Sequence, residues 1–353
     1  MRVVDVDVVV FGGGPAGSVV AEQLRARGRR VVLLGREATR LSVGDHLPFE
    51  GAAPLARLGA WSDFLGTSPL RSAGICSYWG DDAASEKPGL LQPGGAGWHL
   101  DRPAFDAMLL RRAATAGAEI LIDARVTSID GDPFDWTIDI AASELRLRAA
   151  WLVDATGRAC WLARRLGTEP RVIDELYGFV RFWNDAEIRP YALIEACPDG
   201  WWYSAALPHG RAVTIFMSDV QQGRGRPWQR DWQGTRTARR FRAARPIVPD
   251  FSRRATSQWV HPHPDAGWTP VGDAALARDP LSSAGLTASL ASAPACAAAI
   301  DGVLTGCDRV LRQYAATILW HQREYVATRT RVYAAEGRFS DTPFWRRRRT
   351  LHA

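Results

Sequence analysis

Lysine is nearly absent from this sequence of 353 residues: Lys87 is the only one, and every other basic residue is an arginine. The formal net charge is +6, but the arginines are spread along the chain rather than gathered in one stretch. Recognition of nucleic acid requires a basic patch on one face, so we expect a solvated basic surface and no nucleic-acid partner. The arginine run at 346–349 is predicted to be a solvated end, with contact to an acidic partner as the alternative.

Cysteines are few and far apart. The chain has five of them and no C-x-x-C pair. This spacing argues against a zinc site and against a disulfide framework, and it fits the reducing cytoplasm. His261 and His263 flank a proline but have no third ligand nearby, so we expect no metal.

Long hydrophobic runs are also missing. The longest uncharged stretch, 280–300, is dominated by Ala and Ser and contains Pro294, which predicts a buried helix of small residues rather than a membrane span. The first predicted strand starts within a few residues of Met1, so we expect no signal peptide. The hydrolase motifs G-x-S-x-G and H-E-x-x-H do not occur. We expect a cytoplasmic protein with no membrane partner.

The clearest positive signal is a glycine-rich turn near the N-terminus. An apolar run at 8–11 leads into GGGPAG, which satisfies G-x-G-x-x-G, and a helical pattern and a second apolar run at 31–34 follow. Gly12 allows the sharp turn, Gly14 lets the backbone approach a pyrophosphate, and Gly17 lets the helix pack on the strand. The helix start offers free N–H groups and partial positive charge to phosphates. We predict a bound dinucleotide; the alternative is a purely structural turn.

The acidic residue that usually holds the adenosine ribose is missing from this unit. It should end the second strand, about twenty residues after the glycines. That position holds Gly35, and the nearest carboxylate is Glu37. Either Glu37 reaches back, which we favour, or the ribose contact is lost.

Two later motifs complete the pattern. WLVDATG at 151–157 reads as a strand that ends in Asp154 and Gly157, at a sheet edge where doubly wound folds bind ligands. A short strand at 268–271 runs into Gly272 and Asp273, and DPLSSAGL at 279–286 then opens a helix. Between them, segments within 176–217 predict antiparallel strands, with turns at 198–200 and 209–210.

In this order, G-x-G-x-x-G, DATG and GDAA…DPLSSAGL resemble the FAD-dependent monooxygenases and halogenases of the hydroxybenzoate-hydroxylase superfamily. The resemblance covers essentially the whole chain. It is closest to the branch that modifies tryptophan side chains, which includes quinone-cofactor maturases and peptide-tryptophan hydroxylases. The segments that carry it are GDHLP (44–48), GWHLDRPAFD (97–106), GWWYSAALP (200–208), DPLSSAGL (279–286) and YAAEGRFSDTPFWRRR (333–348).

The resemblance predicts an α/β fold with a doubly wound, Rossmann-type FAD-binding domain, an inserted antiparallel-sheet substrate domain and C-terminal helices. The expected FAD-binding domain comprises residues 1–71, 98–170 and 265–306. The substrate domain comprises 72–97 and 171–264, and 307–353 form the C-terminal helices and basic tail. Locally, we expect helices at 102–116, 231–242 and 308–333, strands of a small sheet at 118–126 and 136–140, and a long loop at 81–97.

FAD is the cofactor that the resemblance implies. Arg102 is expected to donate to its phosphate or ribityl region, Val126 to contact the adenine, and Asp273 to bind the ribityl hydroxyls. A plain N-cap is the alternative for Asp273. The helix start at 283–286 should place N–H groups under the flavin pyrimidine, where reduced flavin is negative. The full set of expected cofactor contacts is Gly12, Gly14, Pro15, Ala16, Gly17, Arg36, Glu37, Arg102, Val126, Asp154, Gly157, Gly272, Asp273, Pro280, Ser283, Ala284, Gly285 and Leu286.

The implied activity is oxygenation of an aromatic substrate. FAD reduced by NAD(P)H or by a separate flavin reductase would react with O2 to a C4a-hydroperoxide, which transfers one oxygen atom to an electron-rich ring. The expected substrate is a tryptophan or another indole, either a free small molecule or part of a tryptophan-containing peptide. Offset stacking on an aromatic wall would hold it, although ordinary sheet core is the alternative for each wall residue. The predicted wall residues are Trp79, Trp201, Trp202 and Tyr203.

Proton transfer needs a titratable group near the flavin. His46, Asp45 and Glu50 are our first candidates, and His99 is the second choice. A histidine such as His46 exchanges protons near neutral pH without a large pKa shift. Surface solvation is the alternative for a lone loop histidine.

Halogenation is disfavoured by particular residues. The resemblance implies that a halogenase carries a lysine on the strand equivalent to 74–80, and this strand has none. The halogenase W-x-W-x-I-P signature would start at Tyr203, and both of its tryptophans are absent. Two other rivals stay open: a flavin-dependent reductase or dehydrogenase of the same superfamily, and a non-catalytic flavoprotein that binds a protein partner.

Overall fold

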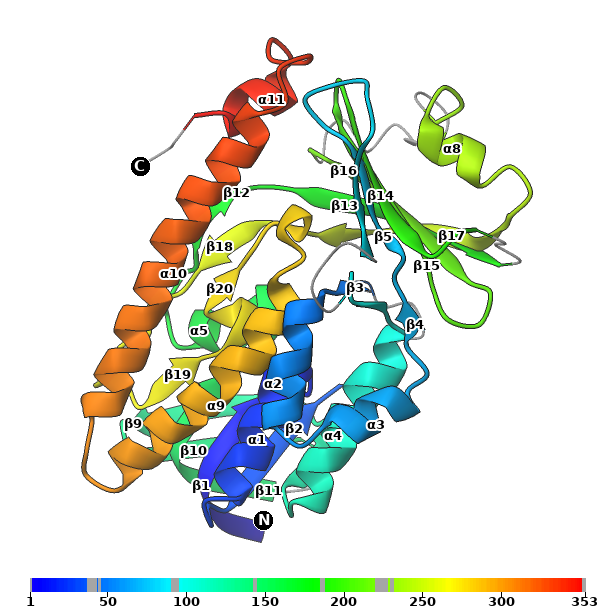
Figure 1. Cartoon of the computed structure of the whole chain (residues 1–353). Coiled ribbons are helices and arrows are strands. Elements are labelled where there is room, and N and C mark those ends of the chain that lie inside the picture. Colours follow the sequence, from blue (N-terminus) through cyan, green and yellow to red (C-terminus); the bar gives the residue numbers. More distant parts are fainter. Residues whose placement is uncertain are drawn as a thin grey trace.

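The computed structural model describes residues 2–36, 43, 46–89, 95–141, 145–184, 188–219, 228 and 232–350. The chain forms two large sheets, and a long C-terminal helix runs beside both of them (Figure 1). The first sheet is mixed and is covered by helices, whereas the second is almost entirely antiparallel. The predicted fold class is confirmed.

The first sheet has the strand order β8-β2-β1-β11-β10-β9, with β19 beside the end of β11. The neighbours β8, β2, β1, β11 and β19 run parallel, and the β9–β10 hairpin adds two antiparallel strands. The bounds are β1 (Arg2–Phe11), β2 (Val31–Gly35), β8 (Glu119–Ile122), β9 (Val126–Asp132), β10 (Asp135–Ile140), β11 (Leu145–Asp154) and β19 (Trp268–Pro270).

Alternating side chains of β1 bury both faces of this sheet. Val8 and Val10 pack in a core with α1 (Pro15–Arg25), α4 (Arg102–Thr115) and α9 (Gly285–Leu304). Val9 and Phe11 belong to a second core with the β9–β10 hairpin and α5 (Trp161–Arg165). A strand buried on both faces reads as a continuous apolar run, as the 8–11 segment does.

One predicted strand of the first sheet is wrong in extent. The sequence pattern predicts one strand at 118–126 and another at 136–140, both in a small sheet. Instead, Asp123 has a positive φ of 53° and divides the segment. β8 before it extends the parallel sheet beside β2, and β9 after it pairs with β10.

The second sheet has the order β17-β13-β16-β15-β14-β5-β6, in which only the β14–β5 pair is parallel. Its strands are β5 (Gly74–Tyr78), β6 (Ser85–Pro88), β13 (Tyr177–Asn184), β14 (Tyr191–Cys197), β15 (Gly200–Ala206), β16 (Ala212–Ser218) and β17 (Arg245–Arg254). The predicted 81–97 loop therefore contains β6. The predicted 231–242 helix is shorter in the described residues, where α8 (Arg236–Arg240) is capped by Thr235.

Short elements connect the sheets. One small sheet has the order β12-β18-β20, and the other has β3-β7-β4. Their strands are β12 (Arg171–Asp174), β18 (Ser257–Trp259), β20 (Leu276–Ala277), β3 (His46–Leu47), β7 (Trp98–His99) and β4 (Leu70–Arg71). The short helices are η1 (Phe49–Gly51), α2 (Ala52–Arg57), α3 (Trp61–Gly66), η3 (Gly157–Ala159), η4 (Gly272–Ala274) and η5 (Pro280–Ser282).

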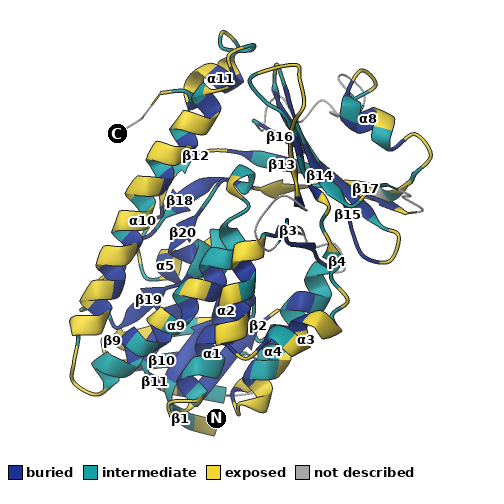
Figure 2. Cartoon of the chain, viewed as in Figure 1, coloured by how far each residue is buried: buried dark blue, intermediate teal, exposed yellow. Residues whose placement is uncertain are grey.

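The C-terminal helices are α10 (Arg309–Ala334) and α11 (Pro343–Arg348). The start of α10 packs on α9, and its end reaches the second sheet, where Tyr333 and Trp345 share a core with Trp201. Figure 2 shows α10 exposed along one side and buried along the other. The prediction of a solvated end is wrong for Arg348, which is fully buried and paired with Asp174 and Asp219.

By length and composition, α9 is apolar enough to cross a membrane, and it is the one such helix among the described residues. Its residues Leu286, Leu290 and Ile300 are buried in the main core. The helix lies between α1 and α10 (Figure 1). This placement agrees with the predicted buried helix of small residues.

Candidate flavin site

A cavity of about 950 Å³ lies between the two large sheets. One side is formed by the β1–α1 turn, the end of β11 and the 271–286 segment. The other side is formed by residues of β13, β15, β16 and β17 in the second sheet. A pocket that joins two layers is where a cofactor and its substrate can meet.

The glycine turn shapes the inner end of this cavity. A Cβ on Gly17 would collide with the carbonyl oxygen of Gly12, and one on Gly12, whose φ is 112°, would collide with the carbonyl of Ala155. A Cβ on Gly14 would meet nothing within 4 Å. Gly12 and Gly17 are therefore required by packing, whereas Gly14 leaves open space beside the backbone for a ligand.

Two helices begin at the cavity without side-chain caps. α1 follows Gly14 and α9 follows Ala284, and neither first turn contains an acidic residue. The N–H groups at these starts lack intrahelical partners and carry partial positive charge. Because 12–16 and 283–286 both line the cavity, the two helix starts favour an anionic ligand there.

Most predicted cofactor contacts line this one cavity. Gly17, Asp154 and Gly272 do not, and Glu37 lies outside the described residues. The predicted contacts that line the cavity are Gly12, Gly14, Pro15, Ala16, Arg36, Arg102, Val126, Gly157, Asp273, Pro280, Ser283, Ala284, Gly285 and Leu286. Arg102 is held in place, since Nε pairs with Asp106 at 2.8 Å and Nη1 donates to the carbonyl oxygen of Val43 at 3.0 Å.

Asp154 supports the site from behind. Its carboxylate is fully buried and accepts hydrogen bonds from the Thr156 N–H, the Thr156 hydroxyl and the Ala163 N–H. Burial raises the pKa of Asp154, and these hydrogen bonds oppose that shift. Gly272 plays a similar packing role, because a Cβ there would lie 2.7 Å from the Cβ of Ala16.

Five further arginines, which no sequence motif predicts as cofactor contacts, also line the cavity: Arg125, Arg158, Arg253, Arg254 and Arg278. Arg158 is the best anchored, since it pairs with Asp273 at 3.4 Å and donates to the carbonyl oxygens of Thr256 and Arg278. Its position directly after the DATG motif was the only local signal for it. These cations match the pyrophosphate of a dinucleotide.

The predicted catalytic residues do not all lie at the cavity. His46 lines the cavity, with Nε2 at 3.1 Å from the carbonyl oxygen of Ala96 and Nδ1 buried without a hydrogen-bond partner. His99 lies behind it on β7, fully buried, with its ring 5.4 Å from that of His46. Glu50 is exposed and does not line the cavity, and Asp45 lies outside the described residues.

Burial dominates the electrostatics of both histidines. It lowers the pKa of His46, against the opposing effects of its Ala96 hydrogen bond and Glu50. For His99, burial and the nearby His46 lower the pKa to about 3. Both imidazoles are therefore neutral at pH 7, so His46 can accept a proton at a free ring nitrogen.

Neighbouring residues of a strand point to opposite faces of the sheet, so only some of the predicted aromatic wall residues reach the cavity. Trp201 and Tyr203 face the cavity from β15. Trp202 lies on the opposite face, packed against Phe216 and other aromatic rings. Trp79 does not line the cavity, but its ring packs edge-on against Trp201 at a centroid distance of 6.3 Å. Two of the four predicted wall residues therefore line the cavity.

Comparison with known proteins agrees with this geometry. A family model described as an FAD binding domain matches residues 5–262. A putative FAD-dependent oxidoreductase of Marinomonas mediterranea, LodB, is 30% identical over 98% of both chains. A digeranylgeranylglycerophospholipid reductase of Methanosarcina mazei is 26% identical over 79% of this chain and 71% of its own.

Solved structures show the same fold. The flavin-dependent halogenase CmlS has a TM-score of 0.85 at 22% identity and covers 99% of this chain and 68% of its own. QhpG, a peptidyl tryptophan dihydroxylase, has a TM-score of 0.78 at 22% identity and covers 99% and 81%. With its glycine turn, two open helix starts and cationic cavity, the chain belongs to the FAD-binding-domain family and is a flavin-dependent oxidoreductase.

Proposed function

We propose that this protein is an FAD-dependent monooxygenase that hydroxylates an electron-rich aromatic ring, with the indole of tryptophan as the preferred substrate. The tryptophan is free or carried by a peptide. Electrons come from NAD(P)H or from a separate flavin reductase, and O2 supplies the oxygen. Bound FAD would provide the redox chemistry, and the protein provides binding, orientation and proton transfer.

The observation that carries this proposal is the shared lining of one cavity. The glycine turn at 12–16, which is of the kind that binds phosphates, lines the same cavity as the aromatic residues Trp201 and Tyr203. Val180, Ile215 and Met217 line the same part of the second sheet, so the wall is largely apolar. Such a wall excludes water and can hold a flat aromatic ring by stacking.

His46 is the residue that we assign to proton transfer. A hydrogen bond from Nε2 to the Ala96 carbonyl oxygen places the imidazole proton on Nε2. Nδ1 is then the acceptor, and it is buried without a partner in a residue that lines the cavity. Because the pKa of His46 is lowered by burial, this acceptor is available at neutral pH.

The relatives support a substrate presented by a larger molecule. QhpG acts on peptidyl tryptophan, and a Pseudomonas fluorescens relative, 26% identical over 46% of this chain, chlorinates a pyrrole group on a peptidyl-carrier protein. Halogenation itself is less compatible with the cavity of this chain. The only lysine, Lys87, is exposed on β6 and does not line the cavity.

The test is mass spectrometry after reaction with 18O-labelled O2. The FAD-loaded protein is incubated with NADH or NADPH, with and without an added flavin reductase, and with a peptide that contains one central tryptophan. N-acetyl-tryptophanamide serves as the free-indole comparison. The proposal predicts a mass gain of one or more labelled oxygen atoms.

Three results would contradict it. Full product yield without O2 would indicate a reductase or dehydrogenase. A halogenated product in the presence of chloride or bromide would indicate a halogenase. Failure to consume O2 with any reductant would indicate a non-catalytic flavoprotein.

A further inference from the structure

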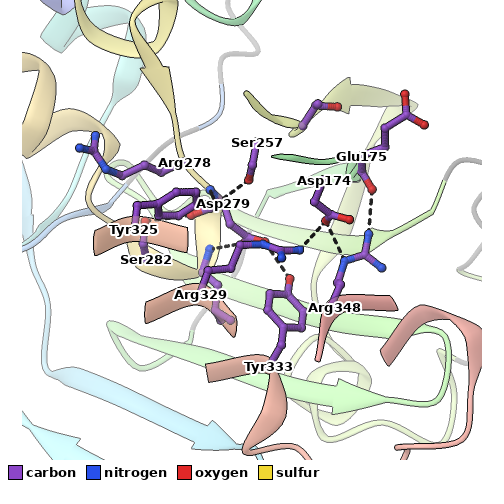
Figure 3. A network of polar contacts seen from close by, with 12 residues as sticks. Asp174, Glu175, Ser257, Arg278, Asp279, Ser282, Tyr325, Arg329, Tyr333 and Arg348 are labelled. Atoms are coloured by element: carbon purple, nitrogen blue, oxygen red, sulfur yellow. Dashed lines mark hydrogen bonds and ion pairs between the residues drawn. The ribbon is translucent and has the colours of Figure 1, made fainter. Parts of the chain in front are cut away.

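A single phenol on the C-terminal helix joins the two walls of the flavin cavity. The indole N–H of Trp201 donates to the hydroxyl of Tyr333 at 3.2 Å. That hydroxyl donates in turn to Oδ2 of Asp279 at 2.8 Å (Figure 3). Trp201 belongs to the wall formed by the second sheet, and Asp279 begins the segment that lines the opposite side.

Asp279 holds that segment in shape. Its side chain is only 2% exposed, and Oδ1 accepts from the Leu281 N–H at 2.9 Å. Its own N–H donates to the hydroxyl of Tyr325 at 2.7 Å. Ser283 follows with a positive φ of 49°, a conformation that a non-glycine residue keeps only when its surroundings enforce it. The N–H groups of the 283–286 helix start therefore depend on contacts made by Asp279.

The contacts come from one stripe of α10. Tyr325, Arg329 and Tyr333 are spaced by four residues and face the same way (Figure 3). Arg329 pairs with Asp174 at 2.6 Å, and its Nε lies 3.7 Å from Asp279. Arg348 of α11 adds a second ion pair to Asp174 at 2.9 Å. These buried pairs fix the stripe against both the cofactor segment and the small sheet that contains β12.

The hydrogen bonds of Tyr333 can run in one direction only. Burial raises the pKa of Tyr333 well above its usual value, and the charge of Asp279 raises it further, so the phenol keeps its proton. An indole N–H can only donate, and a carboxylate can only accept. The hydroxyl must therefore accept from Trp201 and donate to Asp279, which fixes its orientation.

We propose that Tyr333 is a positioning residue that sets the FAD-binding segment 279–286 and the indole of Trp201 relative to one another. Removal of its hydroxyl leaves a buried indole N–H and a buried carboxylate each without one partner, and both groups adjoin the cavity. The inference goes beyond the proposed function, because it concerns FAD binding and holds for any reaction of the flavin.

A double-mutant cycle on FAD affinity tests it. The dissociation constant of FAD is measured by flavin fluorescence for the wild type, W201F, Y333F and the double variant. We expect each single change to weaken FAD binding about three- to tenfold, as expected for one buried hydrogen bond. The double variant should bind about as weakly as the weaker single variant, because both changes break the same chain of hydrogen bonds.

Y314F is the matched control. Tyr314 is a buried tyrosine of the same helix whose hydroxyl donates to the carbonyl oxygen of Pro270 at 3.0 Å, and it does not line the cavity. The effect of Y314F on FAD affinity should be less than about twofold and should multiply with that of W201F. Of the two tyrosine variants, only Y333F should shift the visible absorption of the bound flavin. A Y333F variant that binds FAD as tightly as the wild type, or whose effect multiplies with that of W201F, would overturn the proposal. If Y333F does not fold, D279N replaces it in the cycle. Wild-type FAD affinity of D279N, or an effect that multiplies with that of W201F, would then overturn the proposal.

Discussion

Gly14 and Gly17 stand three residues apart in one turn, yet they serve different purposes. The Cα of Gly17 lies so close to the backbone of Gly12 that a methyl group has no room. Gly14 has an ordinary φ of −74° and open space beside it, and that space belongs to the cavity. At Gly17 the fold requires glycine, whereas at Gly14 the fold leaves room for a side chain, and we propose that the approach of the ligand requires glycine there.

Alanine substitution should separate these two roles. We expect Gly17→Ala to destabilise the protein by several kcal/mol, about 3 or more, because the Cβ collides with backbone that cannot move aside. Gly14→Ala should keep the wild-type melting temperature within about 2 °C, since its Cβ meets no protein atom. Its methyl group would occupy the approach to the pyrophosphate and weaken FAD binding about tenfold or more. Thermal unfolding and FAD titration check both, and equal effects of the two variants would contradict the assignment.

His46 should matter for turnover and not for FAD affinity. General acid–base groups contribute about 10²- to 10⁴-fold in rate, so we expect His46→Gln to lower the rate of oxygen transfer by about 10²-fold. The control is Glu50→Gln, because Glu50 was an equal candidate in the sequence but is exposed and outside the cavity lining. Single-turnover kinetics with reduced enzyme would measure both. A rate loss in Glu50→Gln that matches that of His46→Gln would contradict the assignment.

His99 should make stability depend on pH. Its pKa is about 3 in the folded protein, where burial and His46 lower it, and about 6.5 in the unfolded chain. Between these values the unfolded state binds the extra proton, so the free energy of unfolding falls as the pH drops below 6.5, by up to about 1.4 kcal/mol per pH unit. Urea unfolding of His99→Phe should show a smaller slope between pH 6.5 and 5. Above pH 7.5 the two slopes should agree, and equal slopes at low pH would refute the effect.

At the scale of elements, the parts encoded by short motifs were predictable from sequence. The G-x-G-x-x-G turn combines a buried strand, glycines and a helix within residues 2–25, so each part supports the others. The helix start at 279–286 was predictable for the same reason, because its signal lies in one short stretch of sequence. Strand alternation alone could not predict which face of β15 meets the cavity. Trp201 and Trp202 are both fully buried, and they differ only in their surroundings: Trp201 lines the cavity, whereas Trp202 packs against Phe216.

The C-terminal helices show what local patterns miss. Tyr333 reaches Trp201 across 132 positions of sequence and Asp279 across 54. No spacing rule links such distant residues, and an arginine run near a chain end looks like a solvated surface. Arg348 is instead enclosed by Asp174 of β12 and Asp219, which follows β16, and only the assembled fold brings these residues together.

Two neighbouring arginines of α11 allow a matched test. Arg348→Met leaves Asp174 and Asp219 each short of a cationic partner inside the protein, and we expect a loss of about 3 kcal/mol in the free energy of unfolding. Arg346→Met removes an exposed side chain whose hydrogen bond goes to the carbonyl oxygen of Asp341, and it should cost less than about 0.5 kcal/mol. Urea unfolding of both variants provides the measurement. Similar costs for the two would indicate that α11 is not anchored through Arg348.

At the scale of the whole molecule, the protein places one cavity where its two large sheets meet. The parallel sheet contributes the glycine turn and both open helix starts, as expected for the carboxyl edge of a doubly wound fold. The antiparallel sheet contributes Trp201, Tyr203 and an apolar surface. The long helix α10 touches both sheets, through Tyr314 at Pro270 and through Tyr333 at the second sheet, so the two walls of the cavity form a single unit.

A crystal structure of the FAD complex tests this account most directly. We predict density for the pyrophosphate at Gly14 and at the start of α1, and for the isoalloxazine ring beside residues 283–286, with one face open toward Trp201 and Tyr203. A flavin ring that points to solvent, or FAD bound away from the space between the two sheets, would contradict the account.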